Sequence, residues 1–109
     1  MRIWDIHPNK LCRNHLLGEH RELHAIWSIL INDKKGYSKH PEVKRWNGKL
    51  KALYNRHEAL VEEMKKRKYN HFSPLDFSKA TGSDKQDRLI DSIDEQIKIL
   101  KNKGCRCRV

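Results

Sequence analysis

His15 and Glu22 have the spacing that places two side chains on one face of a helix. At 3.6 residues per turn they differ by about 20° around the helix and by about 10 Å along its axis. Both lie at the rim of an apolar stripe, so we expect the carboxylate to be partly desolvated and suited to proton transfer. By spacing alone, a solvated glutamate and a structural histidine are the more common explanation.

Two other groups of residues could bind a metal but lack partners in the sequence. His20 and His24 are spaced for one helix face, but His-x-Glu-x-His differs from the His-Glu-x-x-His of zinc proteases. Zinc needs further ligands, and no partner cluster is evident. Cys105 and Cys107 also lack a second Cys/His pair, so we expect a frayed basic end there. We therefore expect no metal and no other cofactor.

The charge of the chain indicates a polyanionic partner. Its 109 residues include 24 lysines and arginines against 14 acidic residues, a formal net charge of +10. On so small a protein this charge favours nucleic acid as the partner. The alternatives are that the surplus charge only serves solubility, or that the partner is an acidic protein. No phosphate-cradling Gly-rich loop and no Ser/His/Asp arrangement is evident, which argues against nucleotide hydrolysis and acyl transfer.

The length and the cysteine pattern predict one domain, residues 1–109, in a reducing compartment. Three cysteines, two of them close to the end of the sequence, do not resemble a disulfide framework. No stretch approaches the roughly 20 apolar residues of a membrane span, and the first residues lack a signal-peptide core. We expect a monomer that is cytoplasmic and nucleoid-associated, with no membrane partner.

The apolar periodicity predicts three helices and no strand. After an extended lead that ends at Pro8, the first helix is expected over residues 9–32. The second is expected over residues 41–68 and the third over residues 83–103, with a looser stretch between them. The sequence therefore predicts an all-α fold, a single compact domain of three main helices with an extended N-terminal lead.

Each predicted helix has an apolar face. Gly48 weakens the second helix by about 1 kcal/mol relative to alanine. The main positions expected to be buried in the first and third helices are Leu16, Leu23, Trp27, Leu30, Leu89, Ile90, Ile93, Ile97 and Leu100.

His15 and Glu22 also belong to a longer motif. Arg2-Ile3 precede a His-Leu-x-x-Glu-x-Arg-Glu-Leu run over residues 15–23, which is specific because it fixes most of its positions. Residues 50–60 and 66–70 add a helix with a basic end. Together these segments resemble the pyrimidine-dimer DNA glycosylases of the phage endonuclease V type.

The resemblance implies a DNA glycosylase with AP lyase activity. In this family the N-terminal α-amine attacks the sugar C1′ beside the damaged base and forms an imine. An α-amine has a pKa of about 8, which leaves a useful neutral fraction at pH 7. The phage enzymes expose a threonine after losing their methionine, but this sequence has one residue fewer before Arg2-Ile3. Met1, which is normally kept before a bulky residue, therefore takes the place of the nucleophile.

The resemblance also implies roles for other residues. Glu22 matches the catalytic glutamate, which stabilises the developing sugar cation and moves protons. Arg21 matches an arginine that contacts phosphate, Arg2 a basic residue beside the amine, and His15 a histidine that we assign to substrate positioning. The implied partner is damaged double-stranded DNA.

The sequence departs from the phage pattern at several positions. Ala25 stands in place of a second phosphate-binding arginine, and His20 in place of a tyrosine. Ser92 and Gln96 fall where the phage enzyme has basic residues, and its aromatic C-terminal segment is missing. These differences do not affect the residues matched to the catalytic groups, but they leave the identity of the lesion undetermined.

Replacement basic groups for DNA binding are expected from Lys44 and Arg45, or from Lys49, Lys51 and the C-terminal tail. One alternative function is a non-catalytic basic module that binds nucleic acid through phosphates. Another is a glycosylase/lyase of the same fold that acts on a different lesion. The two enzyme hypotheses require a free Met1 amine, whereas the binding module does not.

Overall fold

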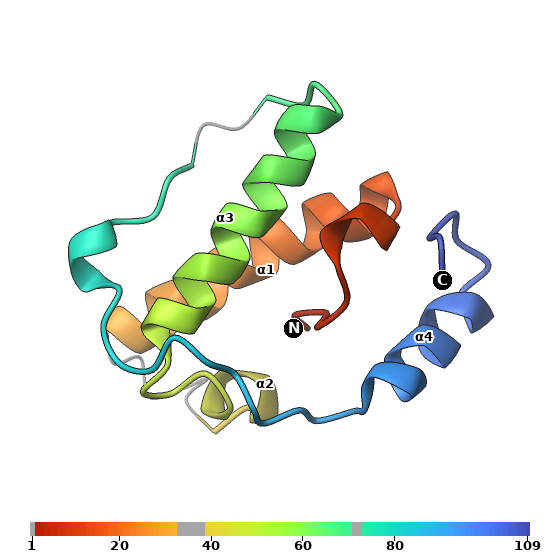
Figure 1. Cartoon of the computed structure of the whole chain (residues 1–109). Helices are drawn as coiled ribbons and strands as arrows, with labels where there is room; N and C mark the ends of the chain where they lie inside the picture. Colours follow the sequence, from red (N-terminus) through yellow and green to blue (C-terminus); the bar gives the residue numbers. More distant parts are fainter. Residues whose placement is uncertain (1, 33–38, 71–72) are drawn as a thin grey trace.

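The computed structural model describes residues 2–32, 39–70 and 73–109, and these form a compact helical body of 36 × 29 × 24 Å (Figure 1). The elements in chain order are η1 (Pro8–Lys10), α1 (Arg13–Ile31), α2 (Pro41–Lys44), α3 (Leu50–Lys66), η2 (Phe77–Lys79) and α4 (Ile93–Asn102). Within these ranges there is no strand, only an isolated bridge between Lys49 and Gly82. The predicted all-α fold with three main helices and an extended lead is confirmed. None of the described helices is both long enough and apolar enough to cross a lipid bilayer.

Helices α1 and α3 cross each other and supply most of the core (Figure 1). Their packing follows from apolar stripes at helical spacing, as the sequence predicts. Leu16, Leu23 and Trp27 are buried as expected, but Leu30 is only half-buried, and Ile29 takes its place in the core. The buried apolar residues of α3 are Ala52, Leu53, Leu60, Val61 and Met64.

The extended lead before α1 is part of the core. Ile3, Trp4, Ile6 and Leu11 are each at most 5% exposed. In Figure 1 the lead lies in the middle of the molecule, with α1 and α3 on one side of it and α4 on the other. Because it has no neighbouring strand, the backbone N–H groups of this buried segment need other partners.

The second predicted helix is interrupted. Instead of one helix over residues 41–68, the chain forms the short α2, a turn and then α3. Gly48, in the turn, has a φ of +75°, a left-handed conformation that glycine adopts without strain. The first turn of α3 is then capped by backbone carbonyls, because the amides of Lys51 and Ala52 donate to Thr81 O (2.9 Å) and Ser83 O (3.1 Å).

The third predicted helix begins ten residues later than expected, at Ile93 instead of residue 83. The preceding residues run along the α2–α3 turn, and their contacts there replace helical hydrogen bonds. Leu89 and Ile90 are consequently 39% and 50% exposed, so their predicted burial is wrong, as it is for Ile93 at 38%. The signal for the true start was the Ser92 cap, whose Oγ accepts from the amide of Glu95 at 3.2 Å.

Candidate active site

The N-terminal lead is held by side chains that reach it from three helices. Four consecutive amides, those of residues 2–5, each donate a hydrogen bond to a carboxylate or a carboxamide oxygen. The four bonds are Arg2 N to Glu22 Oε2 (2.6 Å), Ile3 N to Glu42 Oε1 (3.1 Å), Trp4 N to Glu19 Oε1 (3.1 Å) and Asp5 N to Gln96 Oε1 (2.8 Å). Bonds from N–H groups to ionised acceptors are stronger than neutral ones, so this arrangement fixes the path of the lead.

Glu22 lies next to the start of the chain. Its carboxylate accepts from the amide nitrogen of Arg2, which is the nitrogen that the peptide bond joins to residue 1. Met1 itself, the predicted nucleophile, lies outside the described residues. Glu22 is half-buried, as expected for a residue at the rim of the apolar stripe of α1.

A cleft of about 280 Å³ lies beside Glu22. Its lining combines the lead, one face of α1 and the end of α4, namely Arg2, Trp4, Asn14, His15, Gly18, Glu19, Glu22, Ile99 and Lys103. The structure therefore brings together three of the predicted site residues, Arg2, His15 and Glu22. The cleft is open to solvent and is not an enclosed chamber.

His15 and Arg2 have fixed surroundings in this cleft. The His15 ring packs edge-on against Trp4, with the ring centroids 5.8 Å apart. Burial and the Lys103 ammonium lower the pKa of His15, so its imidazole is mainly neutral at pH 7. The guanidinium of Arg2 lies over the Trp4 ring and is paired with Asp91 at 2.9 Å.

A buried ion pair between Arg56 and Glu19 lies at the wall of the cleft. The Arg56 guanidinium contacts both carboxylate oxygens of Glu19, at 2.6 and 3.0 Å, and also donates to the carbonyl of Ile6 at 2.8 Å. Complete burial raises the pKa of Glu19, although Arg56 opposes the shift. Glu19 thus connects α3 to the lead, a role that the motif did not reveal although Glu19 is part of it.

Arg45 is not a surface residue. Its side chain is 1% exposed, and its guanidinium pairs with Glu42 (2.7 Å) and Asp5 (3.1 Å). It also donates to the carbonyls of Ile3 (2.9 Å) and Arg88 (3.1 Å). This burial argues against the predicted role of Arg45 in DNA binding, because its donors are committed to holding the lead.

The other two predicted DNA-binding residues are on the surface. Arg21 is exposed on α1 and Lys44 is exposed on α2. Neither lines the cleft beside Glu22. Their positions leave both side chains accessible to a phosphate backbone.

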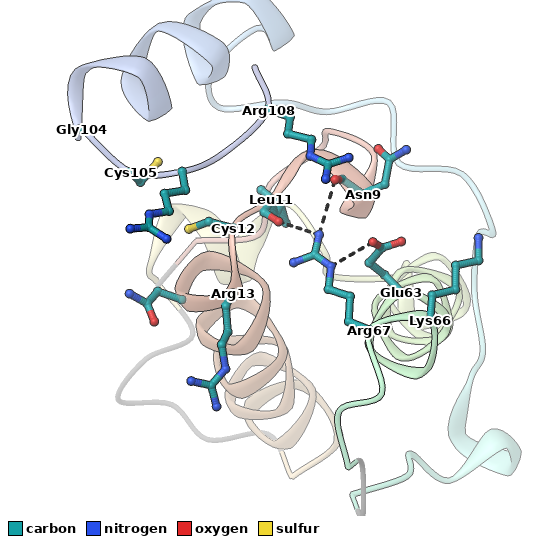
Figure 2. Close-up of a pocket in the computed structure, with 12 residues that line it drawn as sticks. Asn9, Leu11, Cys12, Arg13, Glu63, Lys66, Arg67, Gly104, Cys105 and Arg108 are labelled. Atoms are coloured by element: carbon teal, nitrogen blue, oxygen red, sulfur yellow. Dashed lines mark hydrogen bonds and ion pairs between the residues drawn. The ribbon is translucent and has the colours of Figure 1, made fainter.

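A larger hollow, of about 780 Å³, lies at the start of α1 and the end of α3, under the C-terminal tail (Figure 2). Five basic side chains and a single acidic one, Glu63, line it, and the basic ones are Arg13, Lys66, Arg67, Arg106 and Arg108. Arg67 is held by Glu63 at 3.0 Å and by the carbonyl of Leu11 at 2.7 Å. The sequence indicated only that the tail is basic, because the helix ends that complete the hollow are far apart in the chain. The small cleft contains Glu22, and the larger hollow is a basic surface next to it.

The fold and the cleft define a small basic helical protein that holds its N-terminal residues against a carboxylate beside an open cleft. The family model described as pyrimidine dimer DNA glycosylase matches residues 1–76. The chain belongs to this family, whose name implies glycosylase activity on DNA, and the resemblance seen in the sequence is confirmed. No curated protein and no solved structure matches the chain.

Proposed function

We propose that this chain is a DNA glycosylase with AP lyase activity, acting on pyrimidine dimers or a related damaged base in double-stranded DNA. The nucleophile in this proposal is the α-amine of Met1. The observation that carries it is the 2.6 Å hydrogen bond from the amide of Arg2 to Glu22, the carboxylate that the family motif singles out. A carboxylate fixed one peptide unit from residue 1 is suited to exchanging protons with an amine there.

The proposed reaction has a defined course. The neutral amine forms a bond to C1′ while the C1′–base bond breaks, and the electron pair and a proton go to the base. The amine then loses a proton and its lone pair forms the C1′–N double bond, while the C1′–O4′ bond breaks and O4′ takes up a proton, which gives the protonated imine. Removal of a proton from C2′ then expels the 3′ phosphate and cuts the strand, and water hydrolyses the imine. In these reaction steps Glu22 stabilises the sugar cation and transfers the protons at the amine and at C2′.

The DNA backbone is proposed to follow the basic surface around the cleft. Arg21 and Lys44 remain candidates because both are exposed, and the basic hollow adds Arg13, Arg106 and Arg108. Damaged bases unstack at low cost, so a nucleotide can leave the helix on binding. Each phosphate contact is expected to add about −0.9 to the slope of log affinity against log salt.

Borohydride trapping tests the proposal directly, because it reduces an imine to a stable amine. The duplexes carry a cyclobutane thymine dimer, an abasic site or no lesion, and the protein is used native and with its α-amine blocked. An adduct on the dimer duplex that disappears on blocking is the expected result. An adduct on the abasic site alone supports the lyase and points to another lesion. Folded protein that binds DNA and forms no adduct overturns the enzyme proposal in favour of a binding module.

A substitution at Glu22 separates chemistry from binding. Glu22→Gln keeps an oxygen that can accept from the amide of Arg2 but loses the carboxylate that exchanges protons. We expect turnover to fall by roughly 100-fold or more, with DNA affinity nearly unchanged. Glu62→Gln, at an exposed position of α3, is the matched control and should retain full turnover. Retention of turnover by Glu22→Gln rules out the assigned role.

A further inference from the structure

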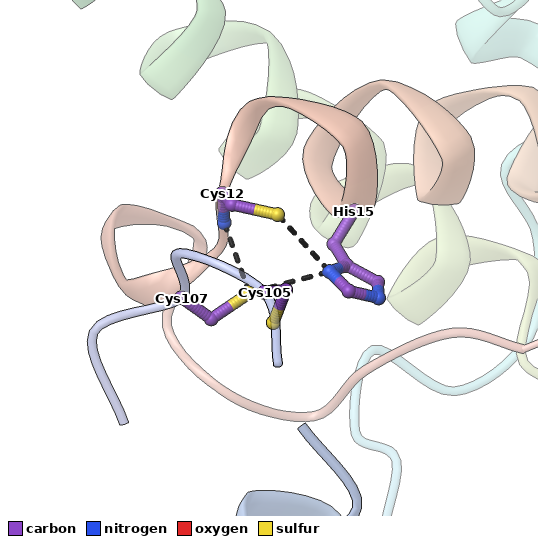
Figure 3. Close-up of side chains that lie close together, drawn as sticks. All are labelled: Cys12, His15, Cys105 and Cys107. Carbon is purple, nitrogen blue, oxygen red and sulfur yellow. Dashed lines mark hydrogen bonds between the residues drawn. The ribbon is translucent and has the colours of Figure 1, made fainter. Parts of the chain in front are cut away.

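Three thiols and an imidazole meet where the C-terminal tail reaches the start of α1 (Figure 3). The Sγ atoms of Cys12 and Cys107 lie 3.1 and 3.3 Å from the Nδ1 of His15. The Sγ of Cys105 completes the group, in which all four ligand atoms lie within 4.8 Å of one another. All three cysteines are free thiols. The tail thus supplies one Cys-x-Cys pair and the helix start one Cys-x-x-His pair, the partner that neither pair shows in the sequence.

We propose that Cys12, His15, Cys105 and Cys107 form a structural zinc site. Three cysteines and one histidine are a common ligand set of closed, four-coordinate zinc sites. With Zn–S near 2.3 Å and Zn–N near 2.0–2.1 Å, tetrahedral geometry separates ligand atoms by about 3.5–3.8 Å. The two Sγ–Nδ1 distances, 3.1 and 3.3 Å, are slightly shorter than these values, and no pair of the four ligand atoms is more than 4.8 Å apart.

The surroundings of the four ligands suit a metal-bound thiolate. The amide of Cys12 donates to the Sγ of Cys107 at 3.1 Å, a bond that would stabilise charge on that sulfur. Zinc with three thiolates has a net charge of −1, and the binding step releases three thiol protons to solvent. The basic hollow beside the group, with Arg13, Arg106 and Arg108, favours that negative charge.

The proposed ion would have a mechanical role. The tail after Gly104 has no regular secondary structure, and one backbone bond, from Arg108 N to Lys10 O at 2.7 Å, ties it to the body. Zinc would fasten the tail to α1 between the two hollows. It would fix the ring of His15 on one side and the positions of Arg106 and Arg108 on the other.

Three histidines of α1 and α3 form a second cluster that could hold a metal ion. The Nε2 atom of His24 lies 3.2 Å from the Nε2 atoms of both His20 and His57. Three nitrogens bound to one tetrahedral ion lie about 3.3 Å apart. His57 contacts Glu58 through Nδ1 at 3.0 Å, the arrangement of carboxylate and histidine that orients a ligating imidazole, and its Nε2 lies 3.2 Å from the carbonyl of Ser73, a contact that an ion would replace. We infer that these three histidines bind a second zinc ion, with α3 supplying the ligand that the His-x-Glu-x-His pattern lacked.

Metal analysis of the untagged full-length protein tests both sites. The wild type is expected to contain about two zinc ions per chain after removal of loosely bound metal. Cys12→Ser and Cys107→Ser should each reduce this to about one, and so should His24→Ala, so each set is the matched control for the other. A wild-type protein that takes up no zinc overturns both proposals. Loss of a single ion in only one set overturns the site whose variants have no effect.

Cobalt substitution needs no variant and therefore does not depend on whether the variants fold. Binding of Co²⁺ to the wild type should produce the near-ultraviolet charge-transfer absorption of cobalt thiolates, and a thiol reagent should react with the three cysteines only after chelation. Trypsin should likewise cut the tail at Arg106 and Arg108 faster in chelator. Cysteines that react equally with and without chelator, or that form a disulfide in place of binding Co²⁺, overturn the cysteine site. Neither site depends on the glycosylase proposal, because none of these readouts measures activity.

Discussion

Replacing Arg45 with methionine separates a structural role from a DNA-binding role. The guanidinium is buried and neutralises the carboxylates of Glu42 and Asp5, while it also donates to two backbone carbonyls. Methionine fills similar space but leaves both carboxylates without their cation. Removing one partner of a buried ion pair typically costs about 3–5 kcal/mol. Since a domain has about 5–15 kcal/mol of total stability, the variant should lose a large part of its free energy of unfolding.

Urea denaturation followed by tryptophan fluorescence measures this loss. Trp4 and Trp46 are buried beside the affected residues and report the transition. Lys44→Met is the matched control, because Lys44 is exposed and precedes Arg45 in the chain. Its free energy of unfolding should change by no more than about 0.5 kcal/mol.

Salt titration of DNA binding gives the opposite readout. If Lys44 contacts a phosphate, its removal should reduce the salt slope by about 0.9, whereas the folded fraction of Arg45→Met should keep the wild-type slope. The structural reasoning is refuted if Arg45→Met costs less than about 1 kcal/mol and reduces the slope. That result would return Arg45 to the DNA-binding surface predicted from the sequence.

Three further substitutions test local features by urea denaturation or hydrogen exchange. Gly18→Ala should raise the free energy of unfolding by about 1 kcal/mol, because Gly18 is inside α1 and an added Cβ meets nothing within 4 Å. Gly82→Ala should lower it by at least about 2 kcal/mol, because φ is +82° and the Cβ would lie 2.1 Å from the carbonyl oxygen of Gly48. Equal effects at the two glycines would contradict the backbone description. Ser92→Ala should cost about 1 kcal/mol through loss of the cap to Glu95, visible as faster amide exchange in α4, and unchanged exchange there would show that the cap is unimportant.

Local patterns in the sequence predicted much of the fold. The stripe of α1 and the motif around Glu22 are regular over many residues, so periodicity and spacing were sufficient to place them. The cap at Ser92 was also readable, but the apolar residues Leu89 and Ile90 extended the helical pattern before it. Tertiary hydrogen bonds to the α2–α3 turn outcompete that local preference, and no periodicity reports them.

The contacts that the sequence could not predict join residues that are far apart in the chain. Arg45 is among the residues of a basic stretch, yet its guanidinium is buried by partners on the lead, on α2 and at Arg88. Cys12 and Cys107 are 95 residues apart and meet because the tail returns across the start of α1. Charge and spacing along the chain describe neighbours in sequence, whereas these pairs are neighbours only in the folded protein.

The backbone hydrogen bonds of the lead fix its register relative to α1, α2 and α4. Because the bonds at residues 2–5 are donated by main-chain amides, they depend on where each residue lies along the lead and not on which side chain it has. Deleting one residue within the lead would shift the residues ahead of the deletion by about 3.3 Å and turn their side chains to the opposite side. An extra residue ahead of Arg2 would leave all four bonds intact and move the terminal amine outward by the same distance. The lead therefore fixes the distance between residue 2 and Glu22, so under the proposed mechanism the removal or retention of one N-terminal residue would decide whether the amine can reach that carboxylate.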